Sequence, residues 1–190
     1  MPKLLDQILV IDIESTCWQG QVPPPGQMSE IIEVGLCLVD VAKLERTEKR
    51  SILIRPVRSQ ISEFCTRLTT LRPDDFRSAG TLADAVSILK REYRSLERLW
   101  ASWGDYDRNQ FLRVCKELTV PYPFGPRHLN IKTLFAVAHG DADESGLDEA
   151  CQRLGRPLEG THHRGVDDAW NIAGILCEVL ARIRGAGVRV

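Results

Sequence analysis

The sequence predicts an α/β fold, in which helices pack on the faces of a mixed sheet. Two observations predict it: three strand-like segments come first, and helical segments with one further strand follow. The chain has 190 residues, of which 43% are hydrophobic, and this suits one domain with a single core. We therefore expect residues 1–190 to form one domain, with a flexible tail at about 185–190.

The predicted strands cover residues 7–13, 30–40 and 48–56. Each is rich in Ile, Leu and Val, and turn-forming or charged segments separate them. The first two are joined by a loop rich in Pro and Gly, QGQVPPPGQMS, for which no regular structure is expected. The second and third are joined by the polar segment VAKLERTEKR, which predicts an antiparallel hairpin.

The segments after Pro56 are mainly helical. SQISEFCTRLTTL predicts a short helical turn or an ordered loop, and residues 81–95 carry apolar side chains at helical spacing with Thr81 as N-cap. A short strand is expected at Leu99–Trp103. Further helices are expected at about 107–118, 129–138, 145–154 and 166–184.

Charge and cysteine usage limit the class of protein. The formal net charge is −1, so any electropositive surface for nucleic acid must be local. None of the six cysteines forms a CxxC pair, which favours reduced thiols in a cytoplasmic protein. No apolar stretch approaches the roughly 20 residues of a membrane span, and the N-terminus has no signal-peptide core.

Two carboxylates interrupt the first predicted strand. Asp12 and Glu14 lie two residues apart, so their side chains leave the same face of the strand. Two adjacent anions repel each other, and a divalent cation with oxygen ligands would neutralise them. The alternative is that the strand ends at Ile13 and that Glu14 is already in solvent.

The segment WGDYDRNQFLRVC offers two more acids, after the fourth predicted strand. Asp107 shares a helical stripe with Phe111, Val114, Cys115 and Leu118, which we expect to face the sheet. Asp105 precedes the helix and could be a turn or capping residue. Asp107 is therefore the better candidate for a metal ligand.

The segment THHRGVDDAWNIAGIL contains two His–Asp pairs with the same spacing. Asp168 shares a stripe with Ile172, Ile175, Leu176 and Val179, the expected buried face of the last helix. Asp167 falls on a stripe with Asn171, Gly174 and Glu178 that is expected to be solvated. These phases favour His163 with Asp168 over His162 with Asp167. The alternative is that Asp168 only stabilises the helix N-terminus.

Together these segments resemble the DEDDh group of 3′–5′ exonucleases. VIDIEST resembles the first motif of that group, SWGDYDRNQFL the second, and HHRGVDDAWNIA the third. SEIIEVGLCLVD and ISEFCTRLTTL resemble the histone-mRNA 3′-end exonuclease branch and its bacterial relatives, some of which are described as sporulation-pathway inhibitors. One departure is TTL at 69–71, where relatives often have Thr-Gly-Ile.

The resemblance implies an RNase H-like fold with a five-stranded mixed sheet, whose first three strands run antiparallel. It implies two Mg²⁺ or Mn²⁺ ions held by Asp12, Glu14, Asp107 and Asp168. His163 would be the general base, and Glu14 would count with it among the catalytic residues.

The expected substrate is the 3′ end of a single-stranded nucleic acid, with RNA favoured, and the expected product is a nucleoside 5′-monophosphate. Arg127, Lys132 and Arg164 could touch phosphates, and Tyr106 could stack on a base or fill the core. A DNA-directed exonuclease, a non-catalytic protein-binding module and an endonuclease of the RNase H kind are the alternatives. The residues expected to contact substrate are Ser15, Thr16, Cys17, Trp18, Phe64, Leu68, Thr69 and Tyr106.

Overall fold

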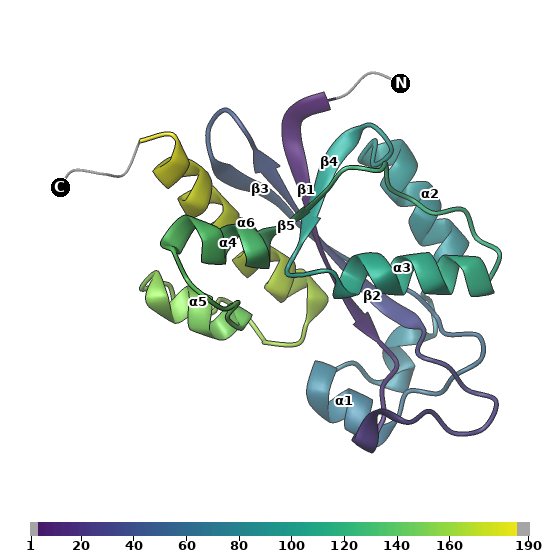
Figure 1. The fold of residues 1–190 in the computed structure, drawn as a ribbon. Coiled ribbons are helices and arrows are strands. Elements are labelled where there is room, and N and C mark those ends of the chain that lie inside the picture. The colour runs from purple at the N-terminus through teal and green to yellow at the C-terminus, as the bar shows by residue number, and fades with distance from the viewer. Residues whose placement is uncertain (1–3, 186–190) are drawn as a thin grey trace.

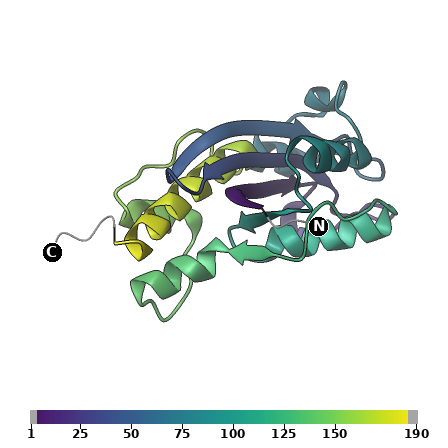
Figure 2. The same cartoon turned by 90° about the horizontal axis from the view of Figure 1, so that it is seen from above.

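The computed structural model describes residues 4–185, in which a single five-stranded sheet runs through the centre. Its strands lie in the order β3-β2-β1-β4-β5, which can be followed in Figure 2. β1 pairs antiparallel with β2, and β2 pairs antiparallel with β3. β4 pairs parallel with β1 and with β5, so the expected mixed sheet is confirmed. The strands are β1 Leu4–Ser15, β2 Ile31–Asp40, β3 Glu45–Leu53, β4 Arg98–Ser102 and β5 His128–Asn130.

Helices cover both faces of the sheet (Figure 1). One apolar cluster joins the sheet to α2 and α3, and a second joins the other face to α4, α5 and α6. Two short 3-10 helices, Gln19–Gln21 and Pro73–Phe76, lie in the loops. The α-helices are α1 Glu63–Thr69, α2 Leu82–Glu92, α3 Tyr106–Glu117, α4 Ile131–His139, α5 Leu147–Arg153 and α6 Gly165–Ile183.

Alternating burial does not apply to β1, because both of its faces are covered. Residues Ile8–Ile11 are all buried, and β1 lies between β2 and β4 in the middle of the sheet. The strand continues past Ile13 to Ser15, so the alternative that it ends at Ile13 is wrong. Asp12 and Glu14 are therefore held on a rigid central strand.

Several expected boundaries differ from the structure, two of them at β3 and α4. The helix expected at 129–138 begins at Ile131, because residues His128–Asn130 pair with β4 and the Asn130 side chain caps the helix. β3 covers Glu45–Leu53 rather than 48–56, and the segment after Pro56 forms α1. The flexible tail was expected at about 185–190, and residues 186–190 lie outside the described residues.

Two expectations drawn from composition concern the cysteines and the length of apolar segments. All six cysteines, which were expected to be reduced, are free thiols in the structure. Among residues 4–185, none of the helices is both long and apolar enough to cross a bilayer.

Candidate active site

The carboxyl end of β1 opens into a pocket of about 320 Å³. Asp12 and Glu14 both line it, as expected for side chains two residues apart on a strand. Asp107, His163 and Asp168 line it as well, although they come from other parts of the chain. The structure thus brings together all five residues that the motifs single out.

α3 delivers Asp107 to the pocket. Its carboxylate accepts a hydrogen bond of 2.9 Å from the backbone N–H of Ile13, between Asp12 and Glu14, and the residue is only 3% exposed. Phe111, Val114 and Cys115 on the same stripe are buried against the sheet, as expected. Asp105 is exposed and accepts a hydrogen bond from the Asn130 side chain, outside the pocket. Of the two candidates, only Asp107 faces the site.

α6 delivers Asp168 by packing its first turn directly on the sheet. A Cβ at Gly35 of β2 would lie 1.9 Å from the carbonyl carbon of Gly165, so only glycine permits this approach. A Cβ at Gly165 would lie 2.9 Å from the carbonyl oxygen of Asp12. This contact puts Asp168, which is 4% exposed, beside the end of β1.

Glu33 fixes the segment that enters α6. This fully buried residue of β2 lies opposite Glu14 in the β1–β2 ladder. Its carboxylate accepts hydrogen bonds from the Arg164 guanidinium, at 3.2 and 3.3 Å, and from the backbone N–H of Gly165, at 3.0 Å. Because charge-assisted bonds are stronger than neutral ones, Glu33 holds the third motif against β2. A glutamate inside the apolar run EIIEVGL was the available sequence signal for this role.

The expected solvation of Asp167 is wrong. Its carboxylate forms an ion pair of 2.5 Å with Lys49 and accepts a hydrogen bond from the backbone N–H of Thr161. Its side chain is 17% exposed, and Asn171 on the same stripe is buried. The helical phase placed this stripe correctly, but β3 packs over it and so removes it from solvent.

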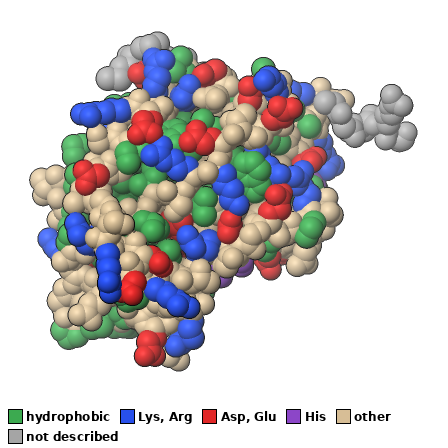
Figure 3. Space-filling model, turned by 180° about the vertical axis from the view of Figure 1, so that it is seen from behind, with side chains coloured by type: hydrophobic (Ala, Val, Ile, Leu, Met, Phe, Trp, Pro, Cys, Tyr) green, Lys and Arg blue, Asp and Glu red, His purple; other side chains and the backbone are tan. Residues whose placement is uncertain are grey.

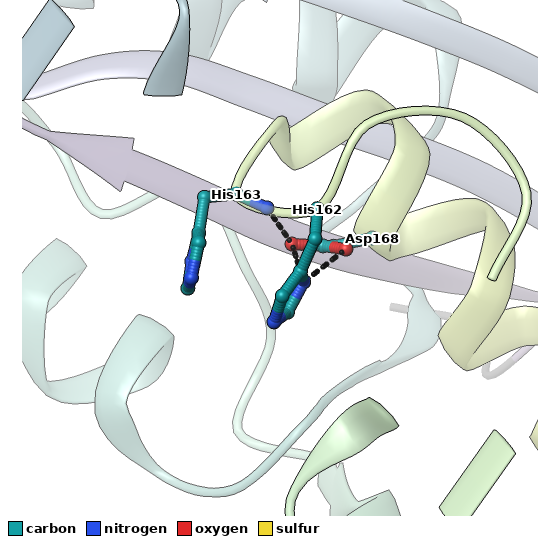
Figure 4. A group of neighbouring side chains, drawn as sticks. All are labelled: His162, His163 and Asp168. Carbon is teal, nitrogen blue, oxygen red and sulfur yellow. Dashed lines mark hydrogen bonds and ion pairs between the residues drawn. The ribbon is translucent and has the colours of Figure 1, made fainter. Parts of the chain in front are cut away.

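The two histidines lie on the same side of the chain (Figure 4). Nδ1 of His162 lies 3.1 Å from Oδ1 of Asp168, whereas His163 reaches Asp168 through its backbone N–H, at 2.8 Å. The two rings stack with centroids 4.0 Å apart. The His163 ring therefore forms no hydrogen bond with Asp168 and lines the pocket. His162 also lines the pocket, although the helical phase of the two aspartates favoured His163 alone.

The described pocket concentrates negative charge. Burial and the neighbouring carboxylates, Asp107 first among them, raise the pKa of Asp12 well above its usual value. Burial and Asp168 raise the pKa of Glu14 to about 9. Burial raises the pKa of Asp107 to about 7, against the lowering effect of the Ile13 N–H bond. Burial also raises the pKa of Asp168, although the bond to His162 opposes this change.

This donor set fits divalent cations. Carboxylate oxygens of Asp12, Glu14 and Asp168 lie within 4.8 Å of one another, and hard cations prefer oxygen ligands. A bound cation would also remove the repulsion that raises these pKa values. Lys132 is the only Lys or Arg side chain that lines the described pocket, and its Nζ lies 3.7 Å from Oε2 of Glu144.

Three of the residues expected to contact substrate form hydrogen bonds within the protein. Thr16 Oγ1 bonds to Met28 O and to the Glu30 N–H, and Thr69 Oγ1 donates to Cys65 O. Ser15 accepts from the Gln110 amide. Cys17, Trp18, Phe64 and Leu68 are partly exposed but are outside the pocket lining.

Tyr106 is the one residue of that group that lines the pocket. It is 58% exposed, so the alternative that it fills the core is wrong. Trp103, Gly146 and Leu147 line the pocket without having been singled out from the sequence, because nothing in their local pattern distinguishes them. Arg127 lies near the amino end of β4, bonded to the Glu97 carbonyl, at the opposite end of the strand from the pocket.

Known proteins with a similar sequence cover most of the chain. Human 3′-5′ exoribonuclease 1 is 29% identical over an alignment 188 residues long, which covers 92% of this chain and 52% of the human protein. The chain thus spans about half the length of that relative. The probable 3′-5′ exonuclease KapD of Bacillus subtilis (strain 168) is 25% identical, over 86% of this chain and 80% of its own length.

Solved structures show the same fold. The nuclease domain of 3′hExo, a DEDDh family member bound to rAMP, superposes with a TM-score of 0.83 at 26% identity, covering 100% of this chain and 98% of that domain. Cell-death related nuclease 4 superposes with a TM-score of 0.76 at 19% identity, over 96% of this chain and 64% of its own, and shows the fold alone. The Exonuclease family model, that of RNase T, matches residues 9–176, and the chain therefore belongs to this family.

Proposed function

We propose that this chain is a metal-dependent 3′–5′ exonuclease. It hydrolyses phosphodiester bonds from the 3′ end of single-stranded nucleic acid, with RNA favoured, and releases nucleoside 5′-monophosphates. The convergence of four carboxylates and His163 in one pocket carries the proposal. The similarity to human 3′-5′ exoribonuclease 1 and to a nuclease domain bound to rAMP supports both the polarity and the choice of RNA.

Asp12, Glu14, Asp107 and Asp168 would hold two Mg²⁺ or Mn²⁺ ions. The chemistry that such ions supply is activation of a water molecule and stabilisation of negative charge on the phosphate oxygens. The protein's part is to keep these carboxylates in place: Asp12 and Glu14 lie on β1, and Asp107 and Asp168 each accept a hydrogen bond from a backbone N–H.

His163 acts as the general base. Burial and the adjacent His162 lower its pKa from the usual value near 6.5. Its ring is therefore neutral at pH 7, which is the form that accepts a proton from the attacking water. The backbone bond from His163 to Asp168 ties this base to the carboxylate cluster.

The pocket fits one terminal nucleotide. A volume of about 320 Å³ is near the lower end for ligand sites, and Trp103, Tyr106 and Leu147 provide apolar surface for a base. Lys132 is in place to contact a phosphate. Farther from the carboxylates, the substrate would meet the backbone of Ser15 and Thr16, the side chains of Cys17, Trp18, Phe64 and Leu68, and the α1 end at Thr69.

The overall charge agrees with a short substrate footprint. Lys and Arg are interspersed with Asp and Glu over the face shown in Figure 3, and the net charge is −1. Since phosphate neutralisation dominates affinity for nucleic acid, a long binding track would need a larger excess of cations. The six free thiols support a location in the reducing cytoplasm.

The test is digestion of matched 5′-labelled RNA and DNA oligonucleotides, single-stranded and duplex, with Mg²⁺, Mn²⁺ or EDTA. A metal-dependent ladder that shortens from the 3′ end, faster on RNA, is expected. Internal cuts in a duplex would indicate an endonuclease, and a faster DNA ladder would indicate a DNA-directed enzyme. No cleavage of any substrate would favour a non-catalytic binding module.

One matched pair of variants and one single variant locate the chemistry. Asp107→Asn should lose at least about 100-fold in rate, whereas Asp105→Asn, two residues away and outside the pocket, should retain it. His163→Ala should lose about 10²–10⁴-fold while Mn²⁺ binding is retained. Loss of Mn²⁺ binding in His163→Ala would make this residue a ligand and contradict its role as base.

A further inference from the structure

The two consecutive histidines form a second group of metal-binding atoms with Asp168. One ligand atom from each of His162, His163 and Asp168 lies within 4.8 Å of the others. This group differs in chemistry from the carboxylates of Asp12, Glu14 and Asp168, which contain no nitrogen donor. The two groups share Asp168 alone.

The backbone makes this arrangement possible. Successive side chains of an extended segment point to opposite sides. His163 has a φ of +63°, in the left-handed region that non-glycine residues seldom adopt. With this turn the two imidazoles lie face to face, 4.0 Å apart and inclined by 24° (Figure 4). Residues held in such a conformation are often functional.

The rings are available to a metal ion. Both histidines are exposed, in contrast to the buried Asp168. Within residues 4–185, the His162 ring forms its hydrogen bonds with Asp168 through Nδ1. His163 donates to Asp168 from its backbone N–H, and its ring does not take part in this bond. Each ring therefore has a nitrogen free to act as ligand, and neutral imidazole is the form that binds metal.

Two imidazoles and one carboxylate suit Zn²⁺ better than Mg²⁺. Zinc takes nitrogen and oxygen ligands at about 2.0–2.2 Å in tetrahedral sites, commonly with three protein ligands and a water. Mg²⁺ prefers oxygen ligands and an octahedral shell. Tetrahedral ligands lie about 3.3–3.5 Å apart at such bond lengths. Rotation of the two exposed rings could bring the ligand atoms, now within 4.8 Å of one another, about 1.5 Å closer, to the spacing of a tetrahedral site.

We propose that His162, His163 and Asp168 bind one Zn²⁺ ion, and that this ion inhibits the enzyme. Binding requires only the three residues, whereas inhibition rests on the function proposed above. Zinc at this position occupies the free nitrogen of His163, so the general base can no longer accept a proton. It also draws Asp168 away from the all-oxygen group. His162 is what gives this chain the additional ligand.

Binding is tested by titrating Zn²⁺ into the protein with Mg²⁺ in large excess, which competes with zinc for the carboxylates of Asp12 and Glu14. Calorimetry should show one zinc per chain, and His162→Gln should weaken the affinity at least about tenfold. His139→Gln is the matched control, because His139 is a histidine of α4 whose Nδ1 bonds to the Phe135 carbonyl outside the pocket. Equal affinity in wild type and His162→Gln would overturn the site.

Nuclear magnetic resonance of the ring nitrogens gives a readout independent of activity. The chain has four histidines, and zinc should shift the signals of His162 and His163 while leaving His128 and His139 unchanged. Shifts confined to other histidines, or to none, would contradict the proposal.

Inhibition is measured as the zinc concentration that halves each protein's own zinc-free rate. His162→Gln should need at least about tenfold more zinc than wild type or His139→Gln. Equal sensitivity of all three would mean that zinc acts at the carboxylates and would overturn the inhibitory site. A wild-type protein that binds zinc as described but cleaves no substrate would instead contradict the proposed function, and the binding site would stand.

Discussion

At the scale of single residues, the acidic cluster costs stability until cations bind. Asp12, Glu14, Asp107 and Asp168 all have raised pKa values, because burial and mutual repulsion disfavour their charged forms. A protein selected only for stability would have apolar or amide side chains there. The sequence revealed these acids because each interrupts an apolar pattern, on a strand or on a helical stripe.

Residue-scale reasoning failed where tertiary contacts decide the environment. Asp167 was expected in solvent but is covered by β3 and paired with Lys49. The ring of His162, rather than that of His163, contacts Asp168, because a left-handed residue turns the backbone between them. Neither contact follows from spacing along the helix.

Asp12→Asn should stabilise the metal-free protein at about pH 8. The amide has nearly the same shape and removes a carboxyl group whose pKa is raised by burial. Because a raised pKa lowers stability at a pH where the unfolded state has lost the proton, a gain in the free energy of unfolding is expected, with loss of nuclease activity. Chemical denaturation in EDTA measures it. The exposed Asp105→Asn should change the unfolding free energy by less than about 0.5 kcal/mol, and a destabilised Asp12→Asn would contradict the account.

Glu33→Gln should destabilise the protein by about 1–3 kcal/mol, because the buried acceptor of the Arg164 and Gly165 N–H bonds loses its charge. The control is Glu178→Gln in α6, which breaks the ion pair of Glu178 with Arg156, a residue between α5 and α6. That glutamate is 49% exposed, so its loss should cost less than about 1 kcal/mol. Urea denaturation of the two variants compares them, and equal effects would show that Glu33 does not anchor α6.

At the scale of elements, the site depends on how closely α6 approaches β1 and β2. The 3.6-residue and two-residue periodicities predicted most of the strands and helices, because long periodic segments bury one face or both. The periodicity did not predict β5, because this strand has only three residues and is defined by its pairing with β4. Packing of the α6 N-terminus on Gly35 was equally invisible, since it joins residues 130 positions apart.

Gly35→Ala should destabilise the protein by at least about 3 kcal/mol and reduce nuclease activity. The added Cβ would meet the backbone of Gly165, which cannot rotate away as a side chain can. Gly174→Ala in α6 is the control, because its Cβ would meet only arginine side-chain ends at 3.4 Å. Helix propensity should make that variant neutral or about 0.5–1 kcal/mol more stable. Thermal unfolding separates the two, and a harmless Gly35→Ala would refute this role of the contact.

At the scale of the whole molecule, three distant parts of the chain build one site. β1 supplies Asp12 and Glu14, α3 supplies Asp107, and α6 with the loop before it supplies His163 and Asp168. The motifs allowed the sequence to predict this convergence through family resemblance. Physical reasoning from the residues alone gave candidate acids in each segment but could not give their distances.

The central claim is that divalent cations neutralise an acidic cluster which is unfavourable without them. A carboxyl group with a raised pKa keeps its proton in the folded state over a pH range in which the unfolded state has released it. Stability therefore falls as the pH rises through that range, which extends from about 4 to about 7 for Asp107 and to about 9 for Glu14. A cation that binds only the folded state should reverse the fall.

The most direct test is the melting temperature from about pH 5 to about pH 9, in EDTA and with Mn²⁺. A free-energy change of 1 kcal/mol moves the melting temperature of a chain of this size by about 2–4 °C. We predict a fall of at least about 5 °C in EDTA across this range, and little or no fall with Mn²⁺. A melting temperature in EDTA that stays level or rises with pH, or one that Mn²⁺ does not raise at about pH 8, would contradict the account.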